Sequence, residues 1–162
     1  MSDSTALAAF DAAIARARTA EEAFAALQTL TRATVGARLF TYMSVDMAKG
    51  LARRAYSSDP ENYPTSGTKP IHRDAWFEVV HKRRDYFVAN TIAAIAEVFA
   101  DHELIDALGC QSVVNMPVIL RDELVGTVNM LDVEGYYTPE RVAAIRETLS
   151  LPAKLCAAIA AG

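Results

Sequence analysis

Two apolar runs separated by a short polar turn constrain this chain more than any other feature. The runs are Ser112–Leu120 and Leu124–Val133, and the turn between them is Arg121-Asp122-Glu123. Apolar runs of this length, rich in β-branched residues and joined by a short turn, predict a β-hairpin. Because both runs are apolar on both faces, we expect this hairpin in the middle of a sheet that is covered on each side.

Length, charge and cysteine content narrow the class of protein. The 162 residues suffice for one domain, residues 1–162, with a sizeable core. A net charge of −4 without blocks of like charge predicts no nucleic-acid partner, because phosphate binding calls for a basic patch. No apolar run approaches the ~20 residues of a membrane span, and the first residues do not resemble a signal peptide. Cys110 and Cys156 are too few for a disulfide framework, so we expect a cytoplasmic protein without a membrane partner.

The segment before the central hairpin predicts two helices and a first hairpin. A helix is expected over Ser2–Arg18, where apolar residues recur at steps of three and four. The second helix opens with a T-x-x-E capping box at Thr19 and ends at Gly36. Aromatic and β-branched residues predict strands over Ala37–Val45 and Leu51–Ser57.

The middle of the chain predicts a long loop and several short elements. Ser58–Pro70 carries three prolines and one glycine, which argues against a regular element. Because loops of this length are usually functional or disordered, we expect an ordered loop that lies over a pocket. A helix over Arg73–Lys82 and a strand over Tyr86–Ala89 follow. Ile92–Leu108 is predicted to be helical, with a break near Asp101, which is positioned to cap a second segment.

A last helix follows the central hairpin and completes the fold class. Thr138 is the expected N-cap and Pro139 the first helical residue. From Val142 to Ile159, apolar residues recur at alternating steps of three and four and form a seam, with a kink expected at Pro152. Strands joined by hairpins predict an antiparallel sheet, and helices grouped at the two ends predict an α+β fold.

The central hairpin and the helix after it carry a family resemblance. Their sequence is LGCQSVVNMPVILRDELVGTVNMLDVEGYYTPERVAAI. It has a small polar residue at Ser112, apolar residues up to Pro117, a charged turn, V-G-T at Val125–Thr127 and a terminal helix. In this order it resembles the GAF domains, which are small-molecule sensor modules related to PAS domains. The resemblance covers the chain from about Thr19 to Ala158. It implies a central antiparallel sheet with the terminal helices on one face and, on the other, a ligand pocket roofed by middle helices and loops.

Two asparagines interrupt the apolar runs of the hairpin. If the turn contains three residues, Leu120 pairs with Leu124 and Asn115 lies directly opposite Asn129, on the same face. A two-residue turn would place the two amides on opposite faces. Buried amides need partners, because an unsatisfied one costs ~1–3 kcal/mol. They are therefore either a polar clamp at the floor of an apolar pocket or a pair whose amides satisfy each other.

His102 and Cys110 are the candidates for chemistry. His102 falls on the apolar face of its predicted helix, where it is either a core residue, a ligand contact or a general acid or base. Cys110 opens the central strand, and a buried cysteine commonly acts as a small apolar residue. A reactive thiolate would need an electropositive setting, and the neighbouring sequence does not indicate one. No pair of histidines and cysteines has the spacing of metal ligands, so no metal site is expected.

Three aromatic residues are candidates for the walls of the implied pocket. Trp76, Tyr56 and Phe99 are expected to face the gap between the sheet and the middle helices. Aromatic pocket walls and ordinary core residues look alike in a sequence, so both roles stay open for each of them. The resemblance names neither a ligand nor a cofactor.

Three functions are consistent with these observations. The first is a cytoplasmic sensor module that takes part in signal transduction and holds a small, partly polar metabolite against Asn115 and Asn129. The second is a small enzyme on the same scaffold, with a redox or isomerase-type activity that uses His102 with Cys110 or Asp101. The third is a dimerisation module that forms a homodimer through its terminal helices, although their apolar seam is equally suited to packing on its own sheet.

Overall fold

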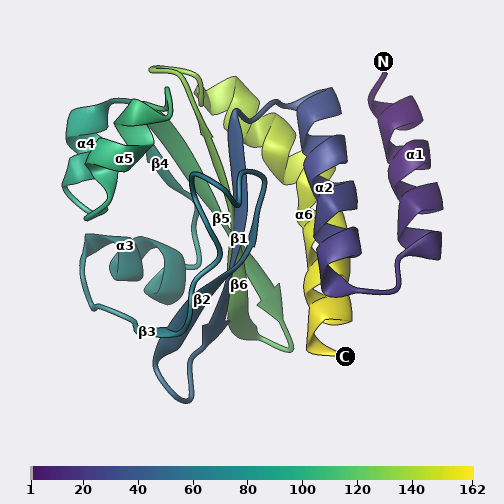
Figure 1. Ribbon diagram of the computed structural model, residues 1–162, viewed down its shortest axis with the longest axis horizontal. Helices are drawn as coiled ribbons and strands as arrows, with labels where there is room; N and C mark the ends of the chain where they lie inside the picture. The colour runs from purple at the N-terminus through teal and green to yellow at the C-terminus, as the bar shows by residue number, and fades with distance from the viewer. Residues whose placement is uncertain (1) are drawn as a thin grey trace.

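The computed structural model describes residues 2–162 and has an α+β fold (Figure 1). Within these residues, a six-stranded antiparallel sheet has the order β3-β2-β1-β6-β5-β4. The strands are β1 (Leu39–Asp46), β2 (Leu51–Ser57), β3 (Lys69–Pro70), β4 (Phe87–Ala89), β5 (Ser112–Leu120) and β6 (Glu123–Asp132). The helices are α1 (Asp3–Arg16), α2 (Ala20–Thr34), α3 (Ala75–Phe77), the π-helix η1 (Glu78–Lys82), α4 (Ile92–Ala96), α5 (His102–Ala107) and α6 (Pro139–Ala161).

The helices form two layers on opposite sides of the sheet. In Figure 1, α1, α2 and α6 lie on one side, and α3, α4 and α5 lie on the other. The predicted antiparallel sheet, with the N- and C-terminal helices together on one face, is therefore confirmed. No helix among residues 2–162 combines the length and the apolar composition that crossing a membrane requires.

Local sequence signals set the ends of the terminal helices. The side chain of Thr19 accepts a hydrogen bond from the backbone N–H of Glu22 at 3.1 Å, which is the first bond of the predicted capping box. In place of the second, the Glu22 carboxylate accepts from the Thr19 hydroxyl at 3.2 Å and not from the Thr19 backbone N–H. Gly36, which follows α2, has a φ of +88°, a conformation that favours glycine. The side chain of Thr138 caps α6, and Pro139 is its first residue.

The larger core lies between the sheet and the terminal helices. Phe24 and Leu27 of α2 pack there against Phe40 of β1. Ile145 and Leu149 of α6 belong to the same cluster. Together with Cys156, they are 0% exposed. The apolar seam of α6 is therefore buried within its own chain, mostly against α2 and β5.

The middle segment is more broken than the sequence predicts. The expected helix over Arg73–Lys82 is the short α3 followed by the π-helix η1. The expected helix over Ile92–Leu108 is divided into α4 and α5, with the break ending at Asp101 as predicted. Asp101 occupies the N-cap position of α5, but its side chain makes no capping bond there, so the predicted capping role is wrong.

The central hairpin reaches the predicted pairing by a different route. Its turn contains two residues, Arg121 and Asp122, both with positive φ, and not the predicted three. The pairing register then shifts between Val118 and Ile119, where Val125 is the additional residue of a β-bulge on β6. This bulge restores the offset that the shorter turn removes. Beyond it, the amide side chains of the two asparagines lie opposite each other, as predicted.

Candidate functional site

A cavity of about 360 Å³ lies between the sheet and the middle helices. Its floor is formed by side chains of the three central strands, β1, β5 and β6. The Ser58–Pro70 segment, here named the lid loop, lines it together with α3 and the segment between α4 and α5. This segment is not wholly irregular as predicted, because its last two residues form β3 and pair with β2. Phe99, Ile105 and Leu131 contribute apolar walls. The cavity is therefore mostly apolar, with a polar strip across its floor.

The polar strip is a directional chain of four side chains, here named the amide ladder. The indole N–H of Trp76 donates to Oδ1 of Asn115 at 3.0 Å, and Nδ2 of Asn115 donates to Oδ1 of Asn129 at 2.6 Å. Nδ2 of Asn129 donates to the hydroxyl of Thr41 at 3.1 Å. Asn115 is 3% exposed and Thr41 is 2% exposed. The two amides thus satisfy each other in part, and both also line the cavity.

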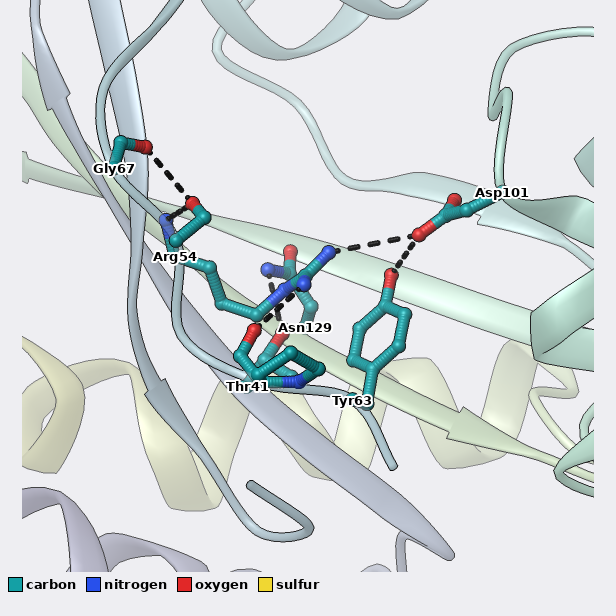
Figure 2. A network of polar contacts seen from close by, with 8 residues as sticks. Thr41, Arg54, Tyr63, Gly67, Asp101 and Asn129 are labelled. Carbon is teal, nitrogen blue, oxygen red and sulfur yellow. Dashed lines mark hydrogen bonds and ion pairs between the residues drawn. The ribbon is translucent and has the colours of Figure 1, made fainter. Parts of the chain in front are cut away.

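A second polar cluster joins the lid loop to the start of α5 (Figure 2). The Tyr63 hydroxyl donates to Oδ2 of Asp101 at 2.6 Å, and the Arg54 guanidinium lies 3.6 Å from the same oxygen. The guanidinium also stacks over the Tyr63 ring, 3.7 Å from its centroid. Burial, and then the neighbouring Asp101 charge, raise the pKa of Tyr63. The phenol therefore stays protonated and able to donate.

Arg54 also fixes the lid loop through its backbone and side chain. Its N–H donates to the hydroxyl of Ser66 at 3.0 Å, and the Ser66 N–H donates to the Arg54 carbonyl at the same distance. Its guanidinium donates to the Pro64 carbonyl at 2.9 Å. The lid loop is thus an ordered segment over the cavity, held from both sides.

A β-bulge on β2 leaves Tyr56 on the face opposite the cavity, whereas Arg54, which precedes the bulge, lies on the cavity face. Tyr42 pairs with Tyr56, whereas Met43 pairs with Arg54, so Ala55 is an additional residue on β2. Tyr56 packs with the terminal-helix core, and its hydroxyl donates to Gln28 of α2. The prediction that Tyr56 faces the middle helices is therefore wrong, because the alternation of side chains is interrupted at the bulge.

The other predicted site residues are divided between the cavity and the core. Trp76 and Phe99 line the cavity, as do the two asparagines. His102 is half-buried and lies outside the lining. Cys110 is 0% exposed and belongs to the smaller apolar cluster beneath the middle helices. Burial, assisted by the Asp132 charge, raises the pKa of the Cys110 thiol to about 11. A protonated, enclosed thiol does not support the role of a nucleophile.

Basic side chains outnumber acidic ones among the charged residues that line the cavity. Arg53, Arg54 and Lys69 line it, against Asp74 and Asp101. Each acidic side chain accepts a hydrogen bond from the protein, Asp74 from the Phe77 N–H at the start of α3 and Asp101 from the lid loop. Within residues 2–162, no cluster of three or more His, Cys, Asp and Glu is arranged to hold a metal ion.

Three residues of the site, Thr41, Arg54 and Tyr63, were not singled out for it by the sequence analysis. Asp101 was considered there only as a helix cap and as a partner of His102. Thr41 had a signal, because alternation along its strand places it on one face with Leu39 and Met43. Tyr63 is the only aromatic residue of the lid loop. Arg54 had no such signal, because a short basic run such as Arg53-Arg54 is ordinarily solvated surface.

The sheet has helices on both faces and a cavity on the face opposite the terminal helices. This arrangement defines an α+β fold, and comparison with solved structures identifies its type. A GAF domain from a phosphoenolpyruvate-protein phosphotransferase of Coxiella burnetii superimposes with a TM-score of 0.73 at 15% identity, over 98% of this chain and 92% of that chain. For the phycocyanobilin-bound GAF domain of a cyanobacterial phytochrome, the TM-score is 0.66 at 18% identity, over 99% and 95%.

An N-acylhomoserine-lactone-dependent LuxR-family transcription factor from Burkholderia cenocepacia is also similar. Its TM-score is 0.67 at 16% identity, over 98% of this chain and 96% of that chain. No protein-family description and no curated protein sequence matches this chain. At these identities the likeness concerns the fold, and the fold is that of a GAF domain, as the resemblance of the central hairpin implies.

Proposed function

We propose that this protein is a small-molecule sensor module whose ligand occupies the cavity between the sheet and the middle helices. The observation that carries the proposal is the composition of that cavity, in which apolar walls surround a short strip of aligned amides. Ligand sites are typically apolar clefts of roughly 300–1,000 Å³ with a few placed polar groups. At about 360 Å³, this cavity suits a small, partly polar metabolite.

Structural neighbours support the same use of the fold. The phytochrome domain was solved with phycocyanobilin, and the transcription factor is described as dependent on N-acylhomoserine lactone. In this chain, the lid loop would enclose the ligand, and Trp76 and Phe99 would contact its apolar part. The free thiols of Cys110 and Cys156 suit a reducing compartment, so we place the module in the cytoplasm.

Native mass spectrometry of the purified protein, followed by denaturation and identification of released molecules, tests this function. We expect a stoichiometric small molecule, or a metabolite that raises the melting temperature when it is added. The Asn129→Leu variant should lose this binding. The matched control is Tyr56→Phe, which removes a polar group from the opposite face of the sheet and should bind as the wild type does. An empty protein that responds to no metabolite would refute the proposal.

A homodimer through the terminal helices is a second proposal that one observation favours. Leu151 and Leu155, one turn apart on α6, are 77% and 42% exposed, although the seam beside them is buried. This surface would pack against a second copy of the chain. Light scattering of the wild type and of Leu151→Lys tests the proposal, since the substitution should convert a dimer into a monomer. A monomeric wild type at high concentration would refute it.

A further inference from the structure

We infer that the cavity selects ligands that carry a hydrogen-bond acceptor, a carboxylate or a carbonyl, on a small apolar body. This inference deepens the proposed function and rests on it. It follows from the direction of the hydrogen bonds along the amide ladder, which determines what that ladder can still offer to a ligand.

Trp76 sets the direction of the ladder. An indole N–H is a donor with no acceptor capacity, so the atom of Asn115 that faces it at 3.0 Å must be the oxygen. Nδ2 of Asn115 is then directed toward Asn129, which must present its own oxygen at 2.6 Å. Nδ2 of Asn129 is consequently directed toward Thr41. One donor at the end of the ladder therefore fixes the orientation of both amides.

The ladder leaves N–H groups that lack an acceptor. Each amide oxygen already accepts one hydrogen bond and keeps a second lone pair, whereas each amide nitrogen uses only one of its two N–H groups within the ladder. A buried N–H without a partner is the costlier of the two, because a carbonyl oxygen that accepts one bond is already satisfied. The Thr41 hydroxyl accepts from Asn129 and keeps its own proton. Asn115, Asn129 and Thr41 all line the cavity, so its floor presents N–H and O–H groups that an acceptor on a ligand would satisfy.

The charges around the cavity agree with this polarity. Each of the two carboxylates at the cavity already accepts a hydrogen bond from the protein itself, Asp74 from the Phe77 N–H and Asp101 from the Tyr63 hydroxyl, and Asp101 also pairs with Arg54. Arg53 and Lys69 at the rim form no ion pair with any residue from 2 to 162. A ligand carboxylate would therefore enter basic surroundings, although the protein as a whole carries a net charge of −4.

Matched sets of small molecules test the inference. Phenyl, cyclohexyl and indol-3-yl groups would each be offered as the acetic acid, its methyl ester and the corresponding ethylamine. Dissociation constants would be measured by calorimetry on the ligand-free protein. We expect the acid or the ester to bind at least tenfold more tightly than the amine for every group that binds. Equal or tighter binding of the amines would overturn the inference and leave the proposed function standing.

Two variants connect the preference to the ladder. Trp76→Phe keeps an aromatic wall but removes the donor that orients the amides, so the ratio of acid to amine affinity should fall below threefold. Thr41→Val removes one floor donor without changing the side-chain shape and should weaken binding of the acid more than that of the amine. The control is Thr31→Val, a buried threonine of α2 on the far side of the sheet, which should leave the ratio unchanged.

If the proposed function itself is wrong, the same experiments give a result that differs from a failure of the ligand preference alone. If no acid, ester or amine binds and native mass spectrometry releases nothing, the cavity is not a ligand site, and both proposals fall. An unchanged ratio in Trp76→Phe and in Thr41→Val, with tight acid binding retained, would overturn the role of the ladder alone.

Discussion

The hydroxyl of Tyr63 donates to the carboxylate of Asp101 at 2.6 Å and so joins two parts of the cavity lining, the lid loop and the N-cap residue of α5 (Figure 2). Tyr63 is only 6% exposed although it lies in a loop rich in proline. The Arg54 guanidinium lies against both side chains, over the ring of one and near the carboxylate of the other.

Removing the Tyr63 hydroxyl should loosen the lid loop. Tyr63→Phe keeps the ring on which Arg54 stacks but loses a hydrogen bond to a charged acceptor, which is worth ~1.5–3 kcal/mol. We expect faster hydrogen exchange in residues 58–70 and faster ligand dissociation. Exchange measured by mass spectrometry checks the first effect. Tyr56→Phe is the control, because its hydroxyl bonds to α2, and unchanged exchange in Tyr63→Phe would show that the contact does not hold the loop.

Thr127 is fully buried, and its hydroxyl has no partner within residues 2–162. A buried hydroxyl without a hydrogen bond loses its hydration without compensation. Thr127→Val should therefore raise the free energy of unfolding, by about 1 kcal/mol. Urea denaturation measures this change.

The control for this prediction is a threonine with the same burial and a satisfied hydroxyl. The Thr31 hydroxyl donates to the Leu27 carbonyl at 2.8 Å, so Thr31→Val should lower the free energy of unfolding by about 1 kcal/mol. If both substitutions destabilise the protein equally, the Thr127 hydroxyl has a partner in solution, and the prediction is wrong.

Gly126 lies under the ring of Tyr42 in the V-G-T segment. A Cβ at this position would lie 2.5 Å from Cζ of Tyr42 and 2.7 Å from the carbonyl oxygen of Met43. Because one of these neighbours is backbone, Gly126→Ala should cost about 1–3 kcal/mol of stability. Thermal and urea unfolding would measure it against Gly67→Ala, whose Cβ would meet no atom within 4 Å. Equal stability of the two variants would contradict the close packing of Tyr42 on the sheet.

The sequence predicts the elements of this fold better than it predicts the direction of single side chains. The hairpins, the terminal helices and the facing of Asn115 and Asn129 follow from apolar patterning, turn residues and caps. Neither β-bulge can be predicted from such patterns, because one additional residue leaves the composition of a strand almost unchanged. The bulge at Val125 compensates for the two-residue turn, so the predicted pairing is confirmed although the predicted turn is wrong.

The bulge on β2 and the packing of the middle helices determine side-chain positions that the sequence could not predict. The additional residue Ala55 leaves Tyr56 outside the cavity, although a register without the bulge would pair Tyr56 with Thr41 on the cavity face. The sequence predicts that Trp76 lies near the gap. Its bond to Asn115 depends on how α3 packs on the sheet, a long-range contact that no local pattern encodes.

The two thiols should make stability fall at alkaline pH. Burial raises the pKa of Cys110 to about 11 and that of Cys156 to about 12, from an ordinary value of 9.0. Well below pH 9, the two thiols are protonated in both the native and the unfolded chain, so their titration does not change the free energy of unfolding. As the pH rises above 9, the unfolded chain releases them first, so the free energy of unfolding should decrease by about 1 kcal/mol per thiol per pH unit.

Urea denaturation between pH 8 and pH 10 separates this effect from other titrations. The wild type should lose stability over this range more steeply than the double variant Cys110→Ala/Cys156→Ala, which has no thiol to ionise. Both thiols should also resist alkylation at pH 8 in the native protein and react fully in urea, because each is 0% exposed. Parallel stability curves for the two proteins would mean that the thiols ionise equally in both states, and rapid alkylation of the native protein would place Cys110 or Cys156 in contact with solvent.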